Sequence, residues 1–159
     1  MTMIDPLVLG YVPNDQQRLL LDGEKLVLDC QKHEMGELSD YSYLVFPFAK
    51  VYEGFLKQLF RDVGAITEKE YQSDHFRIGK SLSPNMARLL GARSAFTWIN
   101  RHYGNDLAMT LWQTWKSGRN LTFHYFPHNI RRLGYEEAVG TISNITGTMK
   151  KALEVTGTR

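Results

Sequence analysis

The sequence predicts an all-α protein: a bundle of about five helices in a single domain spanning residues 1–159. Apolar residues recur at intervals of three and four over most of the chain, which is the period of an amphipathic helix. Residue types typical of helix ends separate these segments, as at Ser83-Pro84 and Gly104-Asn105. Apolar residues make up 43% of the chain, which is enough for one globular core.

The first half of the chain is expected to contain two long helices. Residues 15–33 fit a helix, and they also fit a hairpin around Asp22-Gly23, a pair typical of tight turns. We favour the helix because no further strand is available to extend a hairpin into a sheet. The second helix is predicted from the apolar pattern over residues 44–59, with Pro47 near its start or at a kink.

The second half is expected to contain three more helices after a long connection. Residues 62–82 form this connection, with one helical turn near residues 67–71. The next helix is predicted over residues 83–104, between a serine N-cap and a glycine C-cap, and another over 105–118, where a glycine stops it. The last helix carries apolar residues at heptad-like spacing over residues 138–152, so we expect it to pack along a neighbour.

Positive charge is concentrated in the middle of the chain. Residues 75–135 contain nine Lys or Arg and a single acid, Asp106, whereas the rest of the chain holds ten basic and sixteen acidic residues. A block of this sign attracts phosphate through Coulomb forces and counterion release. Nucleic acid is therefore the expected class of partner, and a solvated basic face is the alternative.

Several classes of protein are not expected from this sequence. No apolar stretch reaches the ~18 residues that a membrane-spanning helix needs, and the N-terminus lacks the pattern of a secretory signal. A single cysteine, Cys30, and five scattered histidines do not make a zinc motif. We therefore expect a cytoplasmic protein that needs no metal and no other cofactor.

The candidate site lies in residues 119–124. Arg119 carries a permanent charge on a planar fork that suits phosphate oxygens, and His124 exchanges a proton near neutral pH. Asn120 adds hydrogen bonds without charge. Metal-free cleavage of RNA needs a base for the ribose 2′-OH, a cation for the charged phosphorus intermediate and an acid for the departing 5′ oxygen. The segment therefore offers groups of the right chemistry.

The same segment has an alternative interpretation. An Arg followed by a His at this spacing is a weak motif by itself. In the alternative, Arg119 faces solvent at a helix end and His124 packs under Phe123 and Phe126. The aromatic residues Phe123, Tyr125 and Phe126 are expected in the core, and stacking on unpaired bases is their second possible role.

The pattern of Arg119-Asn120 followed by His124, late in a small helical chain, resembles the signature of the HEPN superfamily. Residues 43–60 and 119–127 further resemble the HEPN domain of the RNase LS toxin group, and the resemblance covers residues from about 41 to 153. It implies a helical bundle that dimerises and cleaves RNA without a metal, as the toxin of a toxin–antitoxin or phage-defence pair. It also implies catalytic roles for Arg119 and His124, with Asn120 in support.

The RNase LS group also uses a glutamate on an earlier helix, and Glu53 is the position that matches it. Glu53 shares the polar side of its helix with Lys50 and Lys57. In the folded bundle its carboxylate can orient Arg119 or His124. The alternative is an ordinary i,i+4 ion pair with Lys57, worth a few tenths of a kcal/mol.

Another branch of the superfamily carries a tyrosine two residues after the histidine, where nucleotidyl transfer silences the enzyme. Here Phe126 occupies that position and Tyr125 lies one residue earlier, so the resemblance does not support modification of Tyr125.

The chemistry needs both an acid and a base, and the motif supplies one histidine per chain. We therefore expect a homodimer whose twofold axis brings Arg119 and His124 of both subunits to one cleft. The alternative second group is His128 of the same chain. Phe126-Pro127 disfavours the helix that would place His128 one turn from His124.

Expected partners are an RNA substrate, a second copy of the chain and a protein antitoxin, with no membrane. Phosphate contacts are predicted from four cations: Lys57, Lys116, Arg131 and Arg132. The alternative function is a non-catalytic helical module that binds RNA or a nucleotide, in which Arg119 and His124 only support the fold or contact phosphate.

Overall fold

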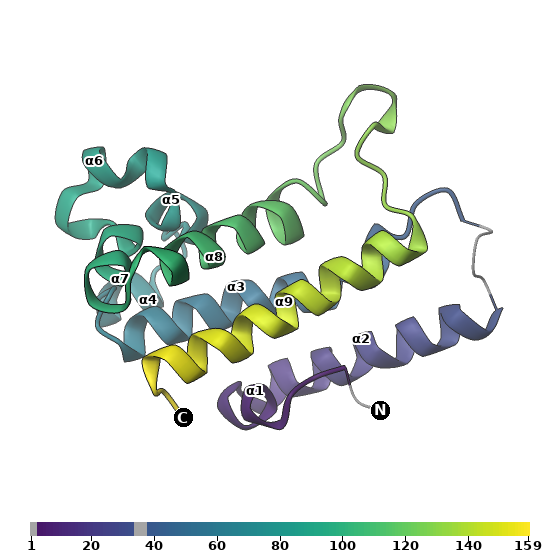
Figure 1. The fold of residues 1–159 in the computed structure, drawn as a ribbon, viewed down its shortest axis with the longest axis horizontal. Helices are drawn as coiled ribbons and strands as arrows, with labels where there is room; N and C mark the ends of the chain where they lie inside the picture. The colour runs from purple at the N-terminus through teal and green to yellow at the C-terminus, as the bar shows by residue number, and fades with distance from the viewer. Residues whose placement is uncertain (1–2, 34–37) are drawn as a thin grey trace.

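The computed structural model describes residues 3–33 and 38–159, and within these ranges every regular element is a helix. The predicted all-α class is therefore confirmed. The described residues form nine α-helices, of which five have nine residues or more: α2 (Asn14–His33), α3 (Ser42–Asp62), α7 (Ala95–Tyr103), α8 (Asn105–Trp115) and α9 (Tyr135–Thr156). Figure 1 shows α3 and α9 side by side at the centre, with α2 on one side and α8 on the other.

The helix α3 lies in the middle of the core, and its side chains are therefore buried around most of its circumference. Its largest fully buried residues are Leu44, Phe48, Tyr52, Phe55, Leu56, Leu59 and Phe60. The hydroxyl of Tyr52 donates a buried hydrogen bond of 2.9 Å to the backbone carbonyl of Leu111 on α8, and burial raises the pKa of Tyr52 well above its usual range. This bond fixes α8 against α3. Pro47 lies within the second turn of α3.

The N-terminal region contains the predicted helix and one helix that the sequence analysis missed. Residues 15–33 lie in α2, so the helix was the correct choice over the hairpin. Gly23 is buried inside α2, and a Cβ there would lie 2.7 Å from Cε2 of Phe48. Asp22-Gly23 is therefore a place of close helix packing and not a turn. The missed helix is α1 (Pro6–Tyr11), which the side chain of Asp5 caps.

The connection after α3 contains the expected helical turn and a second one. The turn α4 (Glu68–Gln72) begins with a capping box between Thr67 and Glu70. The short helix α5 (Ile78–Leu82) follows, which the sequence analysis did not predict.

The prediction of one continuous helix over residues 83–104 is wrong. The region forms two 3₁₀ turns (Pro84–Met86 and Gly91–Arg93), the short helix α6 (Ala87–Leu90) and then α7. Gly91 has a φ of 56°, which ends α6, and the side chain of Ser94 accepts a hydrogen bond from the backbone of Thr97 to start α7. Gly104 ends α7 as predicted.

The predicted stop at Gly118 is also wrong. The chain passes from α8 directly into a π-helical turn, Lys116–Asn120, closed by a 2.8 Å hydrogen bond from the backbone N–H of Leu121 to the carbonyl of Lys116. Gly118 is buried in this turn. Residues 121–134 then extend away from the bundle as a long loop, with a 3₁₀ turn (Pro127–Asn129) near its tip, before α9 begins (Figure 1). No helix in the described ranges is long and apolar enough to cross a membrane.

Candidate functional site

The tertiary structure joins Arg119 to Glu53, which lies 66 residues earlier in the chain. Nε of Arg119 donates a hydrogen bond of 3.2 Å to Oε2 of Glu53, and the two side chains are 39% and 33% exposed. Glu53 projects from the polar side of α3, and the π turn carries Arg119 across to it. Between these described side chains, Glu53 pairs with Arg119 and makes no ion pair with Lys57. The i,i+4 alternative is therefore wrong.

This ion pair lies in a cleft of about 500 Å³ between α3 and the π turn, which we name the Arg119 cleft. Its charged lining residues are Lys50, Glu53, Lys57 and Arg119. Three cations against one carboxylate make the cleft positive, and this charge favours an anionic ligand such as phosphate.

Two aromatic rings also line the Arg119 cleft. Phe46 of α3 and Phe123 of the loop meet edge to face, with ring centroids 5.9 Å apart. The guanidinium of Arg119 lies 5.9 Å from the centre of the Phe123 ring, and Nζ of Lys50 lies 5.8 Å from that of Phe46. Each of the two cations therefore lies over the face of an aromatic ring, within the distance of a cation–π interaction. Phe46 is 52% exposed, so its ring is also accessible to a ligand.

The π turn explains why Arg119 reaches the cleft. An i→i+5 turn inserts one residue relative to an α-helix and changes the direction of the side chains that follow, and such turns occur frequently at functional sites. The hydroxyl of Thr122 donates a hydrogen bond of 2.7 Å to the carbonyl of Ser117, which ties down the end of the turn. The sequence contains no signal for a π turn, so sequence analysis placed Arg119 past a helix end.

Asn120, the last residue of the π turn, contacts His124 of the following loop through its side chain. Nε2 of His124 lies 3.1 Å from Oδ1 of Asn120. The amide oxygen accepts this hydrogen bond from the tautomer that is protonated at Nε2, and in that tautomer Nδ1 is the unprotonated ring nitrogen. His124 is exposed, and the alternative in which it packs under Phe123 and Phe126 is wrong. His124 does not line the Arg119 cleft of its own chain.

The four predicted phosphate contacts lie in different places. Lys57 lines the Arg119 cleft, and Lys116 is exposed at the first position of the π turn. Arg131 lies 5.2 Å from the centre of the Phe126 ring and lines a separate hollow of about 410 Å³ beside α9. Arg132 is exposed on the limb of the loop that returns to α9. Lys50 also lines the cleft, although the sequence analysis did not select it as a phosphate contact. It lies three residues before Glu53, and this spacing was the sequence signal that could have identified it.

The tip of the loop is more exposed than the sequence suggested. Tyr125 is 78% exposed, so the expectation of a core position is wrong for this residue. Phe126 is extended, with φ −108° and ψ 153°, as its place before Pro127 predicted. His128 lies in the left-handed region with φ 61° and is exposed, and the extended backbone before it does not place it one helical turn from His124.

Asp40 anchors the base of this loop to the start of α3. Its Oδ1 accepts hydrogen bonds from the hydroxyl and the N–H of Ser42 and from the N–H of Leu133, and Oδ2 accepts from the side chain of Asn129. Burial raises the pKa of the Asp40 carboxyl, but these hydrogen bonds outweigh it and hold the pKa below its usual value. These bonds tie residues 129–133 of the loop to the start of α3.

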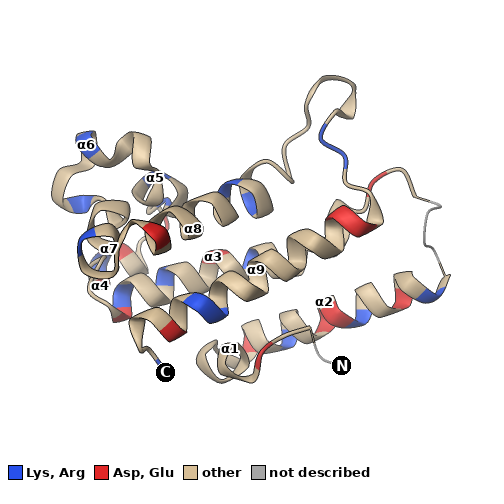
Figure 2. Cartoon of the chain, viewed as in Figure 1, with Lys and Arg blue, Asp and Glu red and all other residues tan. Residues whose placement is uncertain are grey.

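The basic residues of the middle segment lie on several elements. Figure 2 shows Lys and Arg on α6, α7, the π turn and the loop, whereas α2 carries both acidic and basic residues. Across the described part of the chain, no three His, Cys, Asp or Glu side chains are grouped as ligands of a metal ion.

No protein-family model, curated protein or solved structure matches this chain.

Proposed function

We propose that the chain is a metal-independent endoribonuclease with an HEPN-type helical bundle, acting in the cytoplasm as a toxin of a toxin–antitoxin or phage-defence pair. One observation carries the proposal: Arg119 and Glu53 pair inside a positive cleft, and Asn120, the next residue of the π turn, hydrogen-bonds the side chain of His124. A permanent cation and an imidazole near a positive cleft are groups that metal-free RNA cleavage needs.

Each residue has a defined task in the proposed reaction. The imidazole of His124 takes the proton from a ribose 2′-OH, and the 2′ oxygen attacks the adjacent phosphorus. Arg119 stabilises the negative charge on the phosphorane, and Glu53 holds the guanidinium in position. Asn120 orients His124 through the amide oxygen. A second imidazole protonates the departing 5′ oxygen, so the products carry a 2′,3′-cyclic phosphate and a 5′-OH.

The second imidazole is proposed to come from a second copy of the chain. Within one chain His124 points outside the Arg119 cleft, so a single subunit supplies the cation but not both proton-transfer groups. A twofold axis beside residues 119–124 would bring two copies of His124 and two of Arg119 to one site. Tyr125 and Ile130, 78% and 74% exposed, supply apolar surface on the loop for such a contact.

The test is incubation of the purified protein with RNA in excess EDTA, followed by analysis of the fragment ends. Wild type is expected to cleave and to leave cyclic phosphate and 5′-OH ends, and Arg119→Gln is expected to be inactive. Lys32→Gln, at an exposed position on α2, is the control that also loses one charge. A requirement for magnesium, or 5′-phosphate ends, would refute the mechanism.

The second candidate is a non-catalytic module that binds RNA or a nucleotide and has a regulatory role. The exposed position of His124 outside the Arg119 cleft favours it, because binding needs the cations and not the imidazole. If His124→Ala binds RNA as tightly as wild type and wild type leaves RNA intact, this candidate replaces the nuclease.

A further inference from the structure

A second positive hollow lies on the surface near α4, α5 and the turn after α6, and we name it the basic pocket. It has a volume of about 400 Å³ and is lined by the cations Lys69, Arg77, Lys80 and Arg93. Glu70 is the single carboxylate of the lining, and its Oε2 already accepts hydrogen bonds from the backbone and side chain of Thr67. The pocket therefore has a clear excess of positive charge.

The cations of the basic pocket have few partners of their own. Within residues 3–33 and 38–159, Lys69, Lys80 and Arg93 form no salt bridge, and Arg77 donates a hydrogen bond of 2.8 Å to the backbone carbonyl of Asp74. Like charges gathered in a hollow repel one another, and an anion placed between them removes that repulsion. Phe76 and His75 also line the pocket, so it presents rings on which a base can stack.

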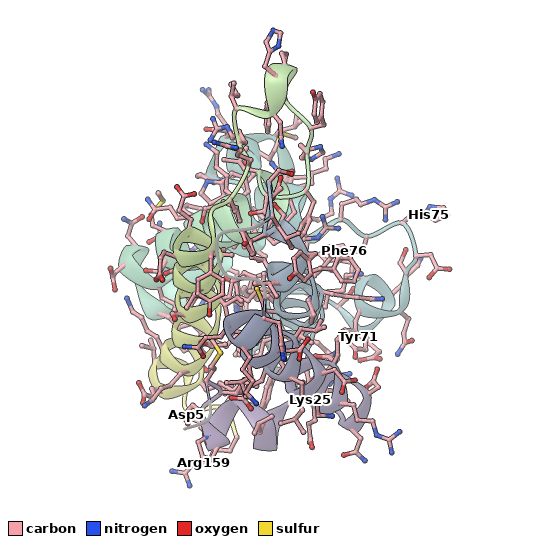
Figure 3. All side chains as sticks on the ribbon, turned by 90° about the vertical axis from the view of Figure 1, so that its right-hand side faces the viewer. Asp5, Lys25, Tyr71, His75, Phe76 and Arg159 are labelled. Carbon is pink, nitrogen blue, oxygen red and sulfur yellow. The ribbon has the colours of Figure 1, made fainter. Side chains whose placement is uncertain are left out.

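Another hollow lies between the basic pocket and the Arg119 cleft and shares lining residues with each of them. Gly54 and Lys57 line both the Arg119 cleft and this connecting hollow of about 380 Å³, and Ser73 lines both the connecting hollow and the basic pocket. Tyr71 and Asp74 complete the connection from the segment around α4. Figure 3 shows Tyr71, Phe76 and His75 along the same side of the bundle. The three hollows are therefore neighbours that share lining residues, and cations line the two outer ones.

We propose that the basic pocket binds a phosphate group of the same RNA strand whose scissile phosphate lies in the Arg119 cleft, at a distance of several nucleotides. The inference rests on the proposed function, which supplies the RNA. Single strands are held by a positive groove that follows the backbone, together with aromatic side chains that stack on bases. The shared lining of the three hollows, with cations in the two outer ones, favours a strand over a free nucleotide.

The experiment measures binding of 2′-O-methylated RNA, which lacks the 2′-OH nucleophile and cannot be cleaved. The test variant is Lys80→Gln/Arg93→Gln, and the matched control, Lys32→Gln/Arg101→Gln, removes one Lys and one Arg from exposed positions outside the three hollows. Loss of two phosphate contacts lowers the slope of log Kd against log salt by about 1.4. At 0.1 M salt, one decade below 1 M, this change in slope corresponds to roughly 25-fold weaker binding. A fluorescent dodecanucleotide should show this loss with the test variant and not with the control.

A dinucleotide, too short to reach from the Arg119 cleft to the basic pocket, should bind both variants like wild type. A second test variant, Lys69→Gln/Arg77→Gln, removes the other two cations of the pocket and should reproduce the effect, which guards against a folding defect in the first. Circular dichroism melting checks the fold of each variant.

The possible outcomes separate this inference from the proposed function. If wild type cleaves RNA but both test variants bind the dodecanucleotide like the control, the basic pocket is not part of the RNA site and the inference is wrong. If wild type does not cleave but the test variants lose binding, the nuclease proposal fails and the extended RNA site stands. If adenosine 5′-monophosphate binds wild type and not the test variants, while RNA binding is equal in all, the pocket holds a free nucleotide and the strand proposal is overturned.

Discussion

The α-carbon of Gly118 faces the side chain of Ile145 so closely that a Cβ on residue 118 would lie 2.9 Å from Cδ1 of that isoleucine. The approach brings the π turn against α9. The turn carries Arg119 to Glu53 on its other side, so the absence of a side chain at residue 118 positions the candidate site.

We expect Gly118→Ala to destabilise the protein by about 1–3 kcal/mol because the new methyl group overpacks this contact. The matched control is Gly140→Ala in α9, where a Cβ meets nothing within 4 Å and the better helix former should be neutral or stabilising by up to about 1 kcal/mol. Denaturant melts of both variants measure the difference. Ile145→Val, which removes Cδ1, should recover part of the loss in the Gly118→Ala background. Equal stability of the two glycine variants would show that the turn does not lie against α9.

The ion pair between Arg119 and Glu53 predicts non-additive effects on RNA cleavage. Arg119→Lys keeps the charge but loses the planar fork, and a loss of about 10²-fold in kcat is expected. Glu53→Gln should lower kcat by about tenfold, because Arg119 loses the charged group that positions it. If Glu53 acts through Arg119, the double variant should lose little more than Arg119→Lys alone. Losses that multiply in full would assign Glu53 a separate role.

The proposed dimer predicts how activity depends on mixed subunits. If both copies of His124 serve one composite site, a heterodimer of wild type and His124→Ala is inactive. Activity should then fall with the square of the wild-type fraction, to about a quarter at equal mixing. Subunits are unfolded and refolded together before the assay so that they exchange. A linear fall, to about half, would show that each chain acts alone.

The lowered pKa of Asp40 predicts a pH-dependent contribution to stability. A carboxyl whose pKa is lower in the folded than in the unfolded protein stabilises the fold above its unfolded pKa, near 3.9, and loses this effect as the pH falls through its folded pKa. The difference in melting temperature between wild type and Asp40→Asn should therefore be largest above about pH 5 and shrink below about pH 4. Asp22→Asn, an exposed carboxylate paired with Lys25, is the control and should show little difference at any pH. A difference that stays constant down to pH 2 would contradict the anchoring role of Asp40.

Much of the helical structure follows from local sequence. Helix periodicity identified α2, α3 and α9, the helical turn expected near residues 67–71 is α4, and the glycine C-cap at residue 104 marked a real helix end. These features depend on residues three or four apart, which interact in the same way in any helical bundle. The concentration of positive charge was equally visible, because it needs only a count along the chain.

The tertiary structure determined the backbone conformation and the packing at three glycines. At Gly23 the sequence allowed a turn as the alternative to a helix, and at Gly118 it suggested a stop; both are places where a helix or π turn packs closely on Phe48 or Ile145. At Gly91 the sequence suggested continuation, and a positive φ breaks the helix. A glycine permits close packing and unusual backbone angles alike, so the neighbouring elements determine which of the two occurs.

The candidate site also has some features that the sequence predicted and others that only the tertiary structure determined. From the sequence, Arg119, His124 and Asn120 were chemically suitable, and Glu53 was selected through the family resemblance. The pairing of Arg119 with Glu53 and the neighbouring positions of the three hollows depend on contacts between residues far apart in the chain. Such contacts are set by how whole helices pack, which no local pattern specifies.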